Sequence, residues 1–262
     1  MLNCDRFVIF SDNCGLIALF QPLTSASSSQ DLFCVATTHL LFSPKRGDIK
    51  LAQIQYFLAE IDRISLKDGR SNSYYPIIIC GDFNAQPQSP LSRFLIDGHI
   101  KYDEYRRIEI SGQIPSSMVN HRFSLQLPSN SLLPPAFVTP ECRFPHLITS
   151  MDEAQSIFHS TIAETSSATL THNKRFHSVY DLEDPSKVTT RIDNESSTVD
   201  YIFYTRSGGR GDRDRLNLLG RYNLYDKNMM NHIHLPNHQF ASDHFLLAAK
   251  FALKLHKRKE HD

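Results

Sequence analysis

The apolar residues of this chain fall into short runs separated by polar stretches. Residues 77–80 read Ile-Ile-Ile-Cys, and such a run of β-branched residues predicts a strand buried on both faces. Two further runs, 16–20 and 32–38, predict an antiparallel pair of strands connected by the polar residues 25–30.

A helix is predicted between the second of these runs and residue 77. Its apolar positions follow the three-and-four spacing of one buried helical face: Leu51, Ile54, Phe57, Leu58 and Ile61. Asp48 is placed to cap this helix, which we expect to end near Ile64. If the flanking strands pair in parallel, the residues after each strand lie at the same end of the sheet.

A second helix is predicted soon after residue 84. Ser89 fits the N-cap, Pro90 the first helical position and Gly98 the stop. Three residues of this helix should face the core: Leu91, Phe94 and Leu95.

The pattern weakens from about Lys101 to Ser197, where Ser, Thr, Asn, His and Pro are frequent. We expect 101–197 to be a long polar surface insertion with one helix, at 152–163, because its composition cannot form much core. Strand patterns return at 198–205 and 216–219, and Asp243 and His244 stand at the mouth of a final apolar strand within 241–251.

The run at 77–80 ends abruptly in Gly81-Asp82-Phe83-Asn84. In layered α/β folds, chemistry collects just past the carboxyl ends of buried strands. Gly-Asp-x-Asn is also ordinary turn chemistry, so these residues alone leave both a turn and a site open.

Composition excludes several function classes. The 262 residues allow one sizeable core, and Lys+Arg balances Asp+Glu at 28 each, so no global basic field draws the chain to nucleic acid or to a membrane. The five cysteines are scattered and never paired as C-x-x-C, which predicts a reducing compartment. No apolar run approaches the roughly 18 residues that span a bilayer, and we predict no membrane partner.

Six polar residues lie at or beside predicted strand ends: His39, Asp82, Asn84, Asp200, Asp243 and His244. Together they supply what metal-assisted phosphoester hydrolysis needs. Carboxylates hold Mg²⁺ or Mn²⁺ and position water, while imidazole or amide donors neutralise the charge that grows on the phosphate. Asp200, costly to bury alone, could orient His244 and keep it protonated.

Four motifs in this order resemble those of the exonuclease–endonuclease–phosphatase superfamily: Thr38-His39-Leu40, Gly81-Asp82-Phe83-Asn84, Val199-Asp200-Tyr201-Ile202-Phe203 and Ser242-Asp243-His244. The match is closest to its deadenylase-like branch and, within that branch, to the Angel proteins. The segments 12–16, 44–51 and 218–221 resemble the same proteins.

This resemblance implies an α/β fold, a four-layer α/β/β/α sandwich formed by one domain over 1–262. It implies that His39 and Asn84 contact the scissile phosphate and that Asp82 activates or orients water. Asp200 would orient His244, which stabilises the transition state, and Asp243 would bind the metal. Lys45 and Arg46, in the basic loop after His39, are expected to contact substrate.

The family also carries an Asn and a metal-binding Glu in first strands that lie well upstream of the segment resembling 12–16. Only eleven residues precede Asp12, so we expect the chain to correspond to the carboxyl-terminal part of the domain, with its first strands missing. Two hypotheses follow: a fragment of an active enzyme, or a catalytically weak binding protein.

The function that the resemblance implies is a metal-dependent phosphoesterase acting on RNA 3′ ends. It would remove poly(A) in the 3′-to-5′ direction, open a terminal 2′,3′-cyclic phosphate, or do both. The alternative is a catalytically impaired module that binds RNA or a translation factor. A translation or mRNA-decay factor is a further expected partner, DNA is not, and we expect a cytoplasmic location, with the nucleus as a second one.

Overall fold

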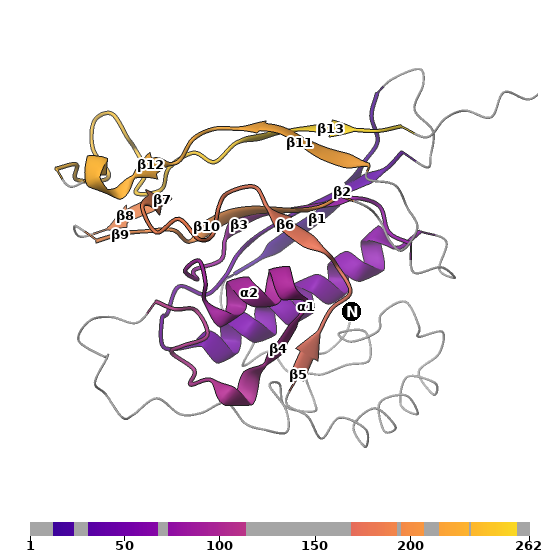
Figure 1. The fold of residues 1–262 in the computed structure, drawn as a ribbon, viewed down its shortest axis with the longest axis horizontal. Helices are drawn as coiled ribbons and strands as arrows, with labels where there is room; N and C mark the ends of the chain where they lie inside the picture. Colours follow the sequence, from indigo (N-terminus) through magenta and orange to yellow (C-terminus); the bar gives the residue numbers. More distant parts are fainter. Residues whose placement is uncertain are drawn as a thin grey trace, which may run out of the picture.

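A computed structural model describes residues 13–23, 31–67, 73–113, 169–192, 195–206, 215–230 and 232–255 (Figure 1). The predicted helix at 152–163 lies outside these residues. The elements, in chain order, are β1 (Gly15–Phe20), β2 (Phe33–His39), α1 (Gly47–Ser65), β3 (Ile77–Asp82), α2 (Pro90–Asp97), β4 (His99–Lys101), η1 (Tyr102–Glu104), β5 (Thr169–Thr171), β6 (Phe176–Ser178), β7 (Lys187–Val188), β8 (Thr190–Ile192), β9 (Glu195–Ser197), β10 (Asp200–Thr205), β11 (Leu216–Arg221), β12 (Tyr225–Asp226), η4 (Lys227–Met230) and β13 (Ala249–Leu253).

The centre of the molecule is a five-stranded sheet in the order β1-β2-β3-β10-β6. β1 and β2 pair antiparallel, as predicted, and β2 and β3 pair in parallel across α1, which confirms the strand–helix–strand unit. β10 runs antiparallel to both of its neighbours, β3 and β6. The first residue of β10 therefore lies at the edge where β2 and β3 end.

Each face of the sheet is covered by a different layer. Figure 1 shows α1 and α2 on one side and the β11–β13 pair on the other. Ile77 and Ile79 pack into the core under the helices, whereas Ile78 and Cys80 pack against the core under β11–β13. This alternation confirms a strand buried on both faces. An outer helical layer over β11–β13, the fourth layer of the expected sandwich, is not found in the described part of the chain.

The helix α2 has the limits that the sequence predicts. The helix α1 differs from the prediction in its N-cap residue. The Ser89 hydroxyl accepts from the Ser92 N–H, and Gly98 ends α2 in the left-handed conformation. Asp48 does not cap α1: the N-cap is Arg46, without a side-chain hydrogen bond. The Arg46 guanidinium donates two hydrogen bonds to the Asp48 carboxylate, with Nε–Oδ1 and Nη2–Oδ2 distances of 3.0 Å. This carboxylate therefore binds Arg46 and not the N–H groups at the start of the helix.

The predicted polar surface segment 101–197 is too broad at both ends. Ile110 is fully buried in the core beneath α1, and β6 forms an edge strand of the central sheet. Isolated apolar residues in this range find partners only in the folded chain, which is why a periodicity search does not detect them. The residues 114–168 lie outside the described part of the chain.

The final strand is also shorter than predicted. β13 covers Ala249–Leu253, whereas His244 lies in an irregular segment that forms a single bridge with Thr190. Phe245 anchors this segment, because its ring is buried against Tyr225 with the centroids 4.6 Å apart.

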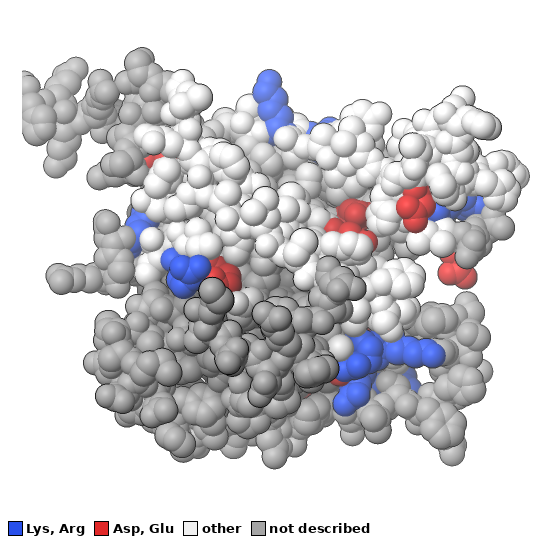
Figure 2. Space-filling view, turned by 180° about the vertical axis from the view of Figure 1, so that it is seen from behind, with Lys and Arg blue, Asp and Glu red and all other residues white. Residues whose placement is uncertain are grey.

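Charge and hydropathy on the described residues are unremarkable. Among the described residues on the face shown in Figure 2, uncharged side chains predominate, and the Lys and Arg side chains lie in separate groups. Cys14, Cys34 and Cys80 are free thiols. None of the described helices is both long and apolar enough to cross a membrane.

We expect Phe83→Ala to destabilise the fold by about 3–5 kcal/mol, because Phe83 is 1% exposed and packs edge-on against Tyr201 and Phe203. Urea unfolding measures this loss. The matched control is Phe42→Ala, at a ring that is 63% exposed, which should change stability by no more than about 0.5 kcal/mol. Equal effects of the two substitutions would contradict the described core.

Candidate active site

Three predicted site residues stand next to one another across the sheet. His39 ends β2, Asp82 ends β3 and Asp200 begins β10, and Asp82 is the direct register partner of both others. Successive side chains along a strand point to opposite faces of the sheet. By this alternation, the three residues lie on the same face as Ile78, Cys80 and Ile202, which is the face toward β11–β13. Their side chains therefore project together from one edge of the sheet.

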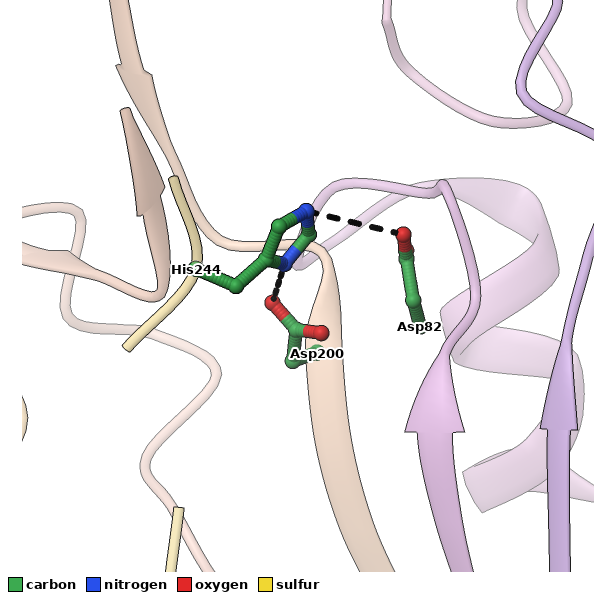
Figure 3. A group of neighbouring side chains, drawn as sticks. All are labelled: Asp82, Asp200 and His244. Atoms are coloured by element: carbon green, nitrogen blue, oxygen red, sulfur yellow. Dashed lines mark hydrogen bonds and ion pairs between the residues drawn. The ribbon is translucent and has the colours of Figure 1, made fainter. Parts of the chain in front are cut away.

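The fourth residue, His244, comes from the irregular segment on the β11–β13 side. Its Nδ1 lies 2.9 Å from Asp200 Oδ2, and its Nε2 lies 3.9 Å from Asp82 Oδ2 (Figure 3). On the other side of Asp82, His39 Nε2 lies 3.4 Å from the same Oδ2 atom. The carboxylate of Asp82 is thus placed between two imidazoles.

Burial and charge shift the proton affinities of this group. The hydrogen bond from His244 to Asp200 raises the pKa of His244 above its ordinary 6.5, and the negative charges of Asp200, Asp82 and Asp243 act in the same direction. Burial raises the pKa of Asp82 above its ordinary 3.8, with a further contribution from the charge of Asp200. The group therefore favours a protonated His244 beside a carboxylate that accepts protons more readily than one in water.

These residues form the wall of a pocket of about 470 Å³. His244 lines it together with residues from the ends of β2 and β3, from the start of β10 and near the start of β1: Cys14, Leu16, Thr37, Thr38, His39, Gly81, Asp82 and Asp200. His39 is the most exposed of the four polar site residues, with 63% of its side chain accessible, so its imidazole faces an incoming molecule.

Residues 81–84 form a turn and also place Asp82 in the pocket wall, so the turn and the site that the sequence left open are compatible. Gly81 has φ of 141°, and a Cβ there would collide with the Thr38 carbonyl oxygen, so only glycine fits between the paired strands. Asp82 Oδ1 accepts from the Asn84 N–H at 2.7 Å, which fixes the carboxylate from behind.

Asn84 does not line the pocket, so its expected phosphate contact stays a prediction. It is 2% exposed, and its amide donates to the Leu40 carbonyl at 3.0 Å and to Asp82 Oδ2 at 3.3 Å. Its φ of 46° lies outside the extended range of a strand. Asn84 orients Asp82 in this structure.

Lys50 is a residue that the sequence reasoning missed. It is fully buried, and its Nζ donates to the Asn84 carbonyl at 2.6 Å and to Gln113 Oε1 at 2.7 Å. Burial lowers its pKa to about 7, although the charge of Asp82 opposes this shift. Lys50 lies four residues before Ile54 on the apolar face of α1. A lysine on such a face indicates a buried amine that needs a partner, and this was the signal in the sequence.

The other predicted site residues are not brought into the pocket. The Asp243 carboxylate lies outside the group formed by Asp82, Asp200 and His244, and its backbone carbonyl accepts from Thr190 and Arg191. Lys45 is exposed, and Arg46 is bound to Asp48. Neither lines the pocket, so their roles as metal or substrate ligands remain predictions.

Asp82, Asp200 and His244 each offer a ligand atom within 4.8 Å of the others. The two carboxylates fit a hard divalent cation, which prefers oxygen ligands and keeps several waters. His244 fits less well, because metal binding needs a neutral imidazole and this one favours its protonated form. The donor set therefore fits a cation held by carboxylate oxygens beside a charged imidazole.

Comparison with known proteins finds relatives over most of the chain. No protein-family model matches the chain. Protein angel homolog 2 from Bos taurus is 36% identical over 270 residues, which is 93% of this chain and 48% of that protein. Protein angel homolog 1 from Rattus norvegicus is 32% identical over 309 residues, which is 93% of this chain and 46% of that protein. The chain is a homologue of the Angel proteins. It spans about half the length of these relatives.

The fold agrees as well. The crystal structure of ANGEL2, a 2′,3′-cyclic phosphatase, in complex with adenosine-2′,3′-vanadate superimposes with a TM-score of 0.74 at 34% identity. The match covers 96% of this chain and 64% of that one. The predicted resemblance to the Angel proteins and the α/β fold of the exonuclease–endonuclease–phosphatase type are therefore confirmed.

The pKa of His244 gives a test of its hydrogen bond with Asp200. Because the folded pKa lies above the unfolded 6.5, the pair stabilises the folded chain fully below pH 6.5, and this stabilisation is lost as the pH rises through the folded pKa. We expect the His244 imidazole to titrate above 6.5 by NMR and Asp200→Asn to lower that midpoint. An unchanged midpoint in Asp200→Asn would contradict the described pair.

Proposed function

We propose that this chain carries a phosphoesterase site that acts on RNA 3′ ends with the help of a divalent cation. One observation carries the proposal: two imidazoles flank a partly buried carboxylate, Asp82, at the wall of an open pocket. Similarity to ANGEL2, described as a 2′,3′-cyclic phosphatase, supports this assignment.

The residues divide the work of hydrolysis. Asp82, whose pKa burial raises, accepts a hydrogen bond from the attacking water and takes up its proton as the oxygen–phosphorus bond forms. Protonated His244, held by Asp200, donates to a phosphoryl oxygen as negative charge grows there. His39 binds the phosphate from the exposed side of the pocket. The phosphorus–oxygen bond to the ribose breaks, and the ribose oxygen takes a proton from solvent water, while Asp82 releases its proton to solvent.

Mg²⁺ or Mn²⁺ would be held by the oxygens of Asp82 and Asp200, together with Asp243 if its carboxylate turns toward them. When bound, such a cation supplies Lewis-acid stabilisation of the phosphoryl oxygens. The residues of this chain still position the water and supply the proton donor.

Two substrates remain within this proposal, a terminal 2′,3′-cyclic phosphate and a poly(A) 3′ end. The description of ANGEL2 favours the cyclic phosphate. The alternative function is a module that binds RNA or a translation factor without turnover. It predicts binding without hydrolysis when RNA is offered to the chain.

We expect the chain, supplied with Mg²⁺ or Mn²⁺, to open a cyclic phosphate on a short RNA faster than it shortens oligoadenylate. Asp82→Asn should lower turnover by roughly 10²–10⁴-fold, because the proton acceptor is lost while the shape is kept. Chromatography of the RNA products measures both rates, and omission of the cation tests the metal requirement.

The matched control is Asp97→Asn, at an exposed carboxylate on α2 away from the pocket, which should leave turnover unchanged. RNA binding without turnover by the unmodified chain would favour the binding module. Turnover that persists in Asp82→Asn would reject the site.

A further inference from the structure

We propose that residues 189–191, through the buried hydroxyl of Thr189, position Asp200 and His244 relative to each other. This role rests on the proposed function, because it acts through the two residues that form the proton-donating pair. Thr189 touches neither the pocket nor the reacting atoms and is therefore a positioning residue.

The side chain of Thr189 fixes the start of β10. Its Oγ1 accepts from the Val199 N–H at 3.0 Å and from the Asp200 N–H at 3.1 Å. Thr189 is fully buried, so water cannot replace these bonds. A hydroxyl oxygen has two lone pairs, and one side chain thus satisfies both backbone donors that set where the Asp200 carboxylate points.

The backbone of the same segment fixes the residues around His244. The Thr189 carbonyl accepts from the Phe245 N–H at 2.8 Å, and the Arg191 N–H donates to the Asp243 carbonyl at 2.9 Å. The Thr190 hydroxyl donates to the same Asp243 carbonyl at 3.0 Å. His244 is therefore held on both sides by the segment whose first residue holds Asp200.

These contacts join two parts of the chain that lie far apart in the sequence. Asp200 and His244 are 44 residues apart, and their hydrogen bond is 2.9 Å long. The residues that flank His244 and the backbone of Asp200 both bind to 189–191, so a shift of this segment changes the separation of the pair.

The test compares two isosteric substitutions on the same strand system. Thr189→Val keeps the shape but removes the acceptor of two buried N–H groups. Thr205→Val, the matched control, removes a buried hydroxyl that accepts from the Ile77 N–H at 2.9 Å, at the far end of β10. Both should lower the urea midpoint, so stability alone does not separate them.

We expect Thr189→Val to lower kcat on the cyclic-phosphate RNA by roughly 100-fold with little change in KM, because the pair is misplaced by a fraction of a bond length or more. Thr189→Ser, which keeps the Oγ acceptor, should restore kcat to near the unmodified value. Thr205→Val should leave kcat unchanged.

A second readout is independent of activity. The proton on His244 Nδ1, held by Asp200, should give a downfield NMR resonance that is lost in Thr189→Val and retained in Thr189→Ser and Thr205→Val. If the unmodified chain shows no turnover, the proposed function fails, and this resonance still decides the positioning role.

The proposal is overturned if Thr189→Val keeps both kcat and the resonance, or if Thr205→Val loses them equally. If Thr189→Val does not fold, Thr190→Val removes only the bond to the Asp243 carbonyl. A lowered kcat and a weakened resonance in that variant support the proposal, and unchanged values overturn it.

Discussion

The hydrogen bond between Asp200 and His244 is the interaction on which the site depends. It joins the first residue of β10 to an irregular segment from the opposite layer, and it makes burial of the Asp200 carboxylate tolerable. The same bond raises the pKa of the imidazole and places its Nε2 3.9 Å from Asp82 Oδ2. Without it, the molecule would hold an unpaired carboxylate at the edge of its central sheet.

Strand register supplies the rest of the geometry. A parallel pair and an antiparallel pair share β3, so the end of β2, the end of β3 and the start of β10 meet at one edge. A shift of one residue would move each side chain to the opposite face. The register is fixed by the buried apolar positions of the same strands, and by Gly81, where no side chain fits.

A second set of polar groups lies beneath this edge and never meets the pocket. Lys50 and Asn84 are both almost completely buried, and together they bind the turn that carries Asp82. Thr189 does the same for Asp200. Buried polar groups need partners, and here the partners are the backbone atoms that position the reactive carboxylates. The interior of the fold and the orientation of the site are therefore set by the same hydrogen bonds.

The sequence by itself determined the strand–helix–strand unit, the caps of α2 and four residues of the site, because these follow from local periodicity, local turn chemistry and motif order. The sequence did not show that Asn84 is buried, or that the Asp243 carboxylate lies apart from Asp82, Asp200 and His244. It also did not predict the strands within residues 169–192. Those features depend on contacts between segments tens of residues apart. The tertiary structure also decided that Lys50 and Thr189 matter, since a buried polar side chain is recognised by its partners, and those partners are distant in the chain.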